Sequence, residues 1–97
     1  MSTVTRTLHQ RARTIFADLG YDLSGNGRTF RAERKWRTVH VTPMAEPETP
    51  PAGGDLRCFV TWADHLPDLE RRLRAAAPDY DWALIGVDGD RYVVRSR

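Results

Sequence analysis

The chain has 97 residues, 40% hydrophobic and 29% charged, and its 15 Lys and Arg against 13 Asp and Glu give a net charge of +2. These values predict one small globular domain, residues 1–97. A balance so close to neutral excludes a chain that is basic throughout, so only a local cluster of cations could bind nucleic acid. One cysteine excludes an internal disulfide. No apolar run approaches the ~20 residues that span a bilayer, and no signal peptide is visible, so we expect a soluble cytoplasmic protein.

Residues 3–19 predict the first helix, because apolar residues recur at helical spacing. Gly20 follows, where a left-handed residue commonly caps a helix. A short extended piece at 21–23 then leads into a turn rich in glycine. The apolar stripe of the helix consists of Val4, Leu8, Ala12, Ile15, Phe16 and Leu19.

Residues 28–42 predict a basic hairpin. Phe30 and Ala32 occupy even positions, whereas Val39 and Val41 occupy odd positions. A single flat strand would place these pairs on opposite faces, so a turn or bulge near Arg34 and Lys35 is needed to bring them onto one core face. We therefore expect one strand near 28–33 and another near 36–42, with Thr29, Arg31, Glu33, Thr38, His40 and Thr42 on the outward face.

The second half of the chain alternates clear signals of strand, helix and turn. Residues 43–55 contain four prolines and two glycines, which predicts a mobile loop. Residues 56–62 predict a strand with apolar residues at both even and odd positions, as in a central strand covered on both sides. Pro67 and Pro78 bracket a second helix at 67–77, and Asp88-Gly89 joins two final strands.

These elements give the order α-β-β-β-α-β-β. We predict a single α+β domain in which two helices pack on one face of a mostly antiparallel sheet. The other face of the sheet would then be either exposed to solvent or covered by a partner. Its candidate residues are Phe59, Ala83, Ile85, Val87 and Val93, and a homodimer through the sheet would cover them.

The basic hairpin favours a non-enzymatic binding module, with nucleic acid as the first candidate partner. Its cations would contact a phosphate backbone, and its tryptophan would offer a face on which a base can stack. The candidate residues are Arg31, Arg34, Lys35, Trp36 and Arg37. A protein-protein interaction or homodimerisation module is the alternative. The order of elements over residues 3–77 also resembles a double-stranded RNA-binding domain, which implies RNA binding.

A second alternative is a metal-dependent nuclease. Glu33 and Lys35 have the Glu-x-Lys spacing of the restriction-endonuclease-like enzymes, with Asp22 upstream. Such enzymes hold a divalent metal with acids and place a lysine near the attacked phosphate. The three histidines, His9, His40 and His65, and Cys58 lack the spacing of a metal site. We therefore predict no bound metal, no small-molecule cofactor and no membrane partner, and we expect Cys58 to be a buried small hydrophobe.

Three segments together resemble a family of small uncharacterised haloarchaeal proteins. They are residues 6–9, Arg-Thr-Leu-His, residues 19–24, Leu-Gly-Tyr-Asp-Leu-Ser, and residues 31–42, which begin Arg-Ala-Glu-Arg-Lys-Trp-Arg. The resemblance implies a cytoplasmic protein of unknown function. Proteins of halophiles usually carry an excess of acids, so a locally basic surface in such a family implies an acidic partner.

Overall fold

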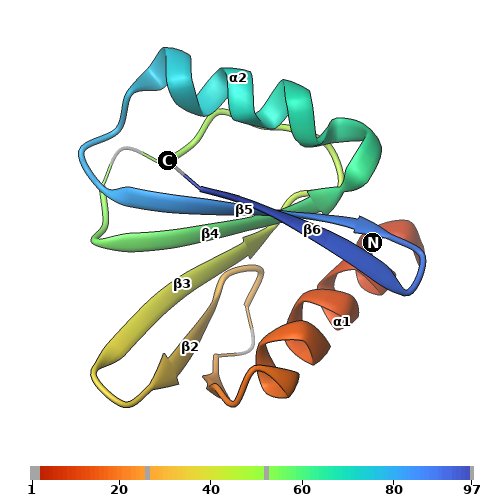
Figure 1. Ribbon diagram of the computed structural model, residues 1–97, viewed down its shortest axis with the longest axis vertical. Coiled ribbons are helices and arrows are strands. Elements are labelled where there is room, and N and C mark those ends of the chain that lie inside the picture. The colour runs from red at the N-terminus through yellow and green to blue at the C-terminus, as the bar shows by residue number, and fades with distance from the viewer. Residues whose placement is uncertain (1–2, 26, 52, 97) are drawn as a thin grey trace.

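The computed structural model describes residues 3–25, 27–51 and 53–96, which form one six-stranded sheet and two helices (Figure 1). The strands lie in the sheet in the same order as in the chain, and three of the five strand pairs are antiparallel. The elements are α1 (Thr3–Asp18), β1 (Asp22–Ser24), β2 (Phe30–Arg34), β3 (Arg37–Pro43), β4 (Leu56–Trp62), a 3₁₀ turn (Ala63–His65), α2 (Leu66–Ala76), β5 (Asp81–Asp88) and β6 (Arg91–Ser96).

The α+β class, the two helices and the mostly antiparallel sheet are confirmed. The predicted order lacked one element, because the piece after α1 pairs with β2 as the short strand β1. β3 runs parallel to β4. The resemblance to a double-stranded RNA-binding domain was therefore wrong, since four strands rather than three precede α2 and two of them are parallel.

The prediction that both helices pack on one face was also wrong, because α1 and α2 lie on opposite faces of the sheet (Figure 1). The side chains of α1 pack with Cys58 and Val60 of β4 in one core cluster. Phe59, between them in the chain, packs with the side chains of α2 in a second cluster. Because side chains alternate along a strand, the apolar residues of β4 need cover on both sides, and one helix supplies each.

The faces proposed for a dimer through the sheet are therefore covered. Ile85 and Val87 belong to the cluster of α1, whereas Phe59 belongs to that of α2. Val93 remains 51% exposed on β6, the edge strand, all of whose described residues are exposed. Of the five residues proposed for that face, Val93 is thus the one whose apolar side chain is exposed to a partner.

The β2–β3 hairpin brings both apolar pairs onto one core face, as predicted. Phe30 lies opposite Val41 and Ala32 lies opposite Val39, so both apolar pairs enter the cluster of α1. The reversal takes place at Lys35 and Trp36, one residue later than expected. On the other face, which carries α2, the Thr29 and Thr42 hydroxyls share a hydrogen bond of 2.9 Å, and Thr42 is buried rather than outward as predicted.

The apolar stripe of α1 is buried at Leu8, Ala12, Ile15 and Phe16, whereas the side chain of Val4 lies outside the described set. Gly20 has a φ of 89°, as the predicted helix cap requires. Gly89 has a φ of 61° in the turn between β5 and β6. Neither helix among the described residues has the length and hydrophobicity needed to span a membrane.

The segment between β3 and β4 crosses the face of the sheet that carries α2. Met44 is buried in the cluster of that helix. The hydroxyl of Tyr80 donates a 2.7 Å hydrogen bond to the carbonyl oxygen of Pro51. Glu48 pairs with Arg28 at the start of the hairpin. These contacts tie the proline-rich segment to the body of the domain at separate points.

The close approach of α2 to the sheet leaves little room for a side chain at position 86. A Cβ there would lie 3.0 Å from Leu66 Cδ2 and 3.2 Å from Ala63 Cα, both at the start of the helical segment. We expect Gly86→Ala to lower the free energy of unfolding by about 1–3 kcal/mol, because the added carbon meets backbone as well as a side chain. Urea denaturation would measure this loss.

Gly53→Ala is the matched control, since nothing lies within 4 Å of the Cβ it would add. Its effect should stay within about 0.5 kcal/mol. Equal stabilities of the two variants would contradict the packing described for Gly86.

Candidate nucleic-acid interface

Four of the five predicted binding residues gather at the tip of the β2–β3 hairpin. Arg34 ends β2 and Arg37 begins β3, and the two are register partners whose side chains leave the sheet on the face of α1. Lys35 and Trp36 form the reversal between them. Both apolar pairs of the hairpin face one core, and this register leaves two residues for the turn.

The side chain of Trp36 is 100% exposed. Tryptophan is usually well buried, because its ring contributes a large apolar surface. Lys35 adopts a φ of 55°, in the left-handed region that favours glycine. The chain therefore keeps a large aromatic residue and a cation at positions where a small polar residue and glycine would suit the turn better.

The tip encloses one side of an open hollow of about 410 Å³. Its lining residues are Tyr21, Arg34, Lys35, Trp36 and Arg37. Tyr21 was not among the predicted site residues, and it reaches the hollow because the chain turns back at Gly20 as α1 ends. Its ring packs edge-on against Phe16, with centroids 5.2 Å apart. The only sequence signal for Tyr21 was its place directly after the helix cap.

The three cations of the hollow have no acidic partner among the residues that the structure describes. Arg34 and Arg37 also lie directly opposite each other on one face, an arrangement that destabilises a sheet through like-charge repulsion. Arg34 lies beside Gly20, with its Nε 3.8 Å from the place a Cβ would occupy there. The end of α1 is the negative end of its dipole, which favours a cation at this point.

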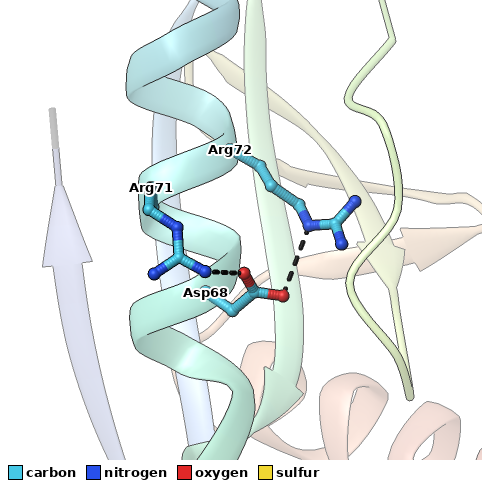
Figure 2. Close-up of polar contacts among 3 residues, drawn as sticks. All are labelled: Asp68, Arg71 and Arg72. Carbon is cyan, nitrogen blue, oxygen red and sulfur yellow. Dashed lines mark hydrogen bonds and ion pairs between the residues drawn. The ribbon is translucent and has the colours of Figure 1, made fainter.

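The cations of α2 differ, because each contacts an acid of the same helix. Asp68 accepts contacts from Arg71 and Arg72 (Figure 2), the second with a distance of 3.3 Å between Arg72 Nε and Asp68 Oδ2. Arg74 lies 3.0 Å from the carboxylate of Glu70. These pairs span three or four residues, the spacing at which side chains meet on a helix. The helix is rich in arginine but presents little free charge.

The structure places Arg31, the fifth predicted residue, away from the hollow. It lies on the face of the sheet that carries α2, where its Nε is 2.9 Å from Glu33 Oε1. Its Nε also donates a 3.4 Å hydrogen bond to the hydroxyl of Ser24. Arg31 is therefore paired on one face while the free cations lie around the tip and the opposite face.

The acids of the nuclease alternative are register partners. Asp22 of β1 lies opposite Glu33 of β2, so both carboxylates leave the same face of the sheet. Lys35 lies beyond the end of β2, in the turn. Throughout residues 3–25, 27–51 and 53–96, no three His, Cys, Asp or Glu side chains converge as a metal site would require.

Cys58 is buried in the cluster of α1, as predicted, and burial raises the pKa of its thiol to about 12. The thiolate is the nucleophilic form of cysteine. At neutral pH the Cys58 side chain is therefore a neutral, apolar part of the core.

One family model matches the chain, over residues 9–94, and it is described as a family of unknown function (DUF7116). The match covers α1 from residue 9 onward and the whole of α2 and of the hairpin. No curated protein and no solved structure matches this chain. The predicted membership of an uncharacterised family is confirmed, whereas its haloarchaeal source stays a prediction.

Proposed function

The chain belongs to this family of unknown function, and from its surface we propose that it is a binding protein for single-stranded nucleic acid, with the hollow at the hairpin tip as its site. The observation that carries the proposal is the fully exposed side chain of Trp36 between three cations without acidic partners. Proteins that bind single strands combine such cations with aromatic faces on which bases stack.

The cations of the tip suit a phosphate backbone. Like charges at Arg34 and Arg37 repel each other in the free protein, and an anion between them would relieve that repulsion. Lys35 adds a third positive charge on the same hairpin. The arginines of α2 differ from this group, because each of them already contacts Asp68 or Glu70.

The aromatic residues of the hollow favour a single strand over a duplex. A duplex keeps its bases stacked inside, whereas an unpaired base exposes a flat face that an aromatic ring can contact. Trp36 provides such a ring in solvent, and Tyr21 provides a second at the edge of the same hollow. Stacking does not depend on base identity, so we expect weak sequence preference.

Replacing Arg34, Lys35 and Arg37 together by Gln should weaken binding to a labelled mixed-sequence oligonucleotide and flatten its salt dependence. Single strands lose roughly 0.7 in the slope of log K against log salt for each phosphate contact removed, so the slope should fall by about 2. Fluorescence anisotropy at several salt concentrations would measure it.

The control replaces Arg71, Arg72 and Arg74 by Gln, which removes the same charge from α2. Because those arginines are already paired, affinity should change little. If both triple variants lost affinity equally, binding would depend on total charge and the site would not be at the hairpin.

Trp36→Ala should reduce affinity for the same oligonucleotide by about fivefold or more, because stacking of one base contributes roughly 1–3 kcal/mol. Trp36→Phe should retain a large part of the affinity, since phenylalanine keeps an aromatic face. Thermal unfolding of both variants should match that of the parent protein, because the side chain of Trp36 is fully exposed. Unchanged affinity of Trp36→Ala would refute the stacking role.

The register of Asp22 with Glu33 favours a second candidate, the restriction-endonuclease-like nuclease. Two carboxylates on one face of adjacent strands could share a divalent metal, and the contact with Arg31 would have to open for Glu33 to bind it. Lys35 would then act near the attacked phosphate.

This candidate predicts cleavage of labelled DNA or RNA in magnesium or manganese that EDTA stops. Glu33→Ala should abolish cleavage, whereas Glu46→Ala, which removes an acid from the proline-rich segment, should leave it intact. A protein without nuclease activity in either metal would end this candidate and leave the binding function untouched.

A further inference from the structure

A second hollow, of about 230 Å³, lies on the face of α1 between the end of that helix and the edge strand β6. We call it the apolar groove. Cys58 and Ile85 contribute to its floor, Leu19 to its side near α1, and Tyr92 and Val94 to its side on β6. It exists because α1 packs mainly over β1, β3 and β4 and ends at Asp18, so the β5–β6 side of this face receives less cover.

The walls of the groove expose apolar surface to solvent. Leu19 is 43% exposed, Tyr92 39% and Val94 59%. Together with Trp36 and Val93 they make up the large hydrophobic side chains that are exposed in the described parts of the chain. Three of these five side chains therefore line one concavity, which is the usual form of a small-molecule site.

The groove opens onto the hairpin tip. Tyr21 and Arg37 line both the apolar groove and the hollow described above. No Asp or Glu is among the groove's lining residues. Arg57 also lines it, but its guanidinium lies over the ring of Tyr80, 5.4 Å from the centroid, and its Nε donates to the Gly53 carbonyl. Arg37, where the groove meets the hollow at the hairpin tip, has no comparable contact among the described residues. We call this end of the groove its mouth.

We propose that the apolar groove binds a small amphiphile with a single alkyl chain and an anionic carboxylate. The chain would lie over Ile85 and Cys58 between Leu19 and Val94, and the carboxylate would meet Arg37 at the mouth. The volume lies below the roughly 300–1,000 Å³ of typical ligand pockets, which suits one narrow chain. The free cation at one end, in a lining without acids, selects an anionic head rather than a neutral or cationic one.

A homologous series of saturated carboxylates from six to twelve carbons tests the proposal. Each is titrated into the purified full chain below its aggregation concentration, with isothermal calorimetry as the readout. A buried methylene contributes ~0.8 kcal/mol, so affinity should rise about fourfold per added carbon until the groove is full and then level off. Alcohols of the same length should bind more weakly, and Arg37→Gln should remove the difference between acid and alcohol.

The edge strand supplies a matched pair of variants. Val94 and Val93 are neighbours of similar exposure, but Val94 lies opposite Ile85 on the groove side and Val93 lies opposite Gly86 on the other side. Val94→Gln should weaken binding of the longest carboxylate about tenfold, whereas Val93→Gln should leave it unchanged. Both variants should bind the oligonucleotide as the parent does, so this test stands apart from that of the hairpin site.

Three results would overturn the proposal. The first is no binding of the twelve-carbon acid. The second is an equal effect of the two valine variants, which would point to nonspecific contact with β6. The third is a parent protein that sediments as a dimer and that Val94→Gln makes monomeric, because a second copy would then occupy the groove.

Discussion

The fold depends on the burial of both faces of β4. This strand has a parallel neighbour on each side, and its apolar residues point in both directions, with Phe59 on one face and Cys58 and Val60 on the other. Strands of parallel sheets require cover on both faces. A helix must therefore lie on each side of the sheet, and the positions of α1, α2 and the proline-rich segment follow from that requirement.

The connections decide which helix takes which face. β3, β4 and β5 are parallel and adjacent, so the chain crosses the sheet surface twice in the same direction. Such crossovers are right-handed in nearly all proteins, so the two connections lie on the same face of the sheet. The contacts of the 44–55 segment and of α2 agree with this placement. Only α1, which precedes the sheet, remains to cover the opposite face. A single helix of 16 residues cannot cover six strands, and the apolar groove is what it leaves uncovered.

Local features of the fold could be predicted because they depend on local patterns. The parity change from Ala32 to Val39 required a hairpin, and Asp88-Gly89 required a turn. The faces of the helices could not be predicted in this way, because the periodicity of a helix shows which of its sides is buried but not against which face of a sheet. The apolar residues at both odd and even positions of β4 indicated cover on both sides, and a helix on each face is the arrangement that satisfies them.

The candidate site could likewise be predicted where it depends on local sequence and not where it depends on tertiary contacts. The density of cations located the hairpin tip, and the register of β2 with β3 brought Arg34 and Arg37 together. Parity placed Arg31 on the outward face in advance, but its pairing with Glu33 depends on side-chain conformation. Tyr21 joins the hollow through the path of the chain after Gly20, a tertiary relation that composition and spacing do not contain.

The strands lie in the sheet in the same order as in the chain, and this order affects how the protein folds. Every strand pairs with the next strand of the chain. The β2–β3 and β5–β6 pairs close through two-residue turns, for which the entropic cost of closure is low. The two parallel pairs of β4 close through longer connections, at 44–55 and 63–80, so we expect them to form after the two hairpins. The sheet can grow from either hairpin by adding one neighbour at a time, and during synthesis β1, β2 and β3 can pair before β4 has left the ribosome.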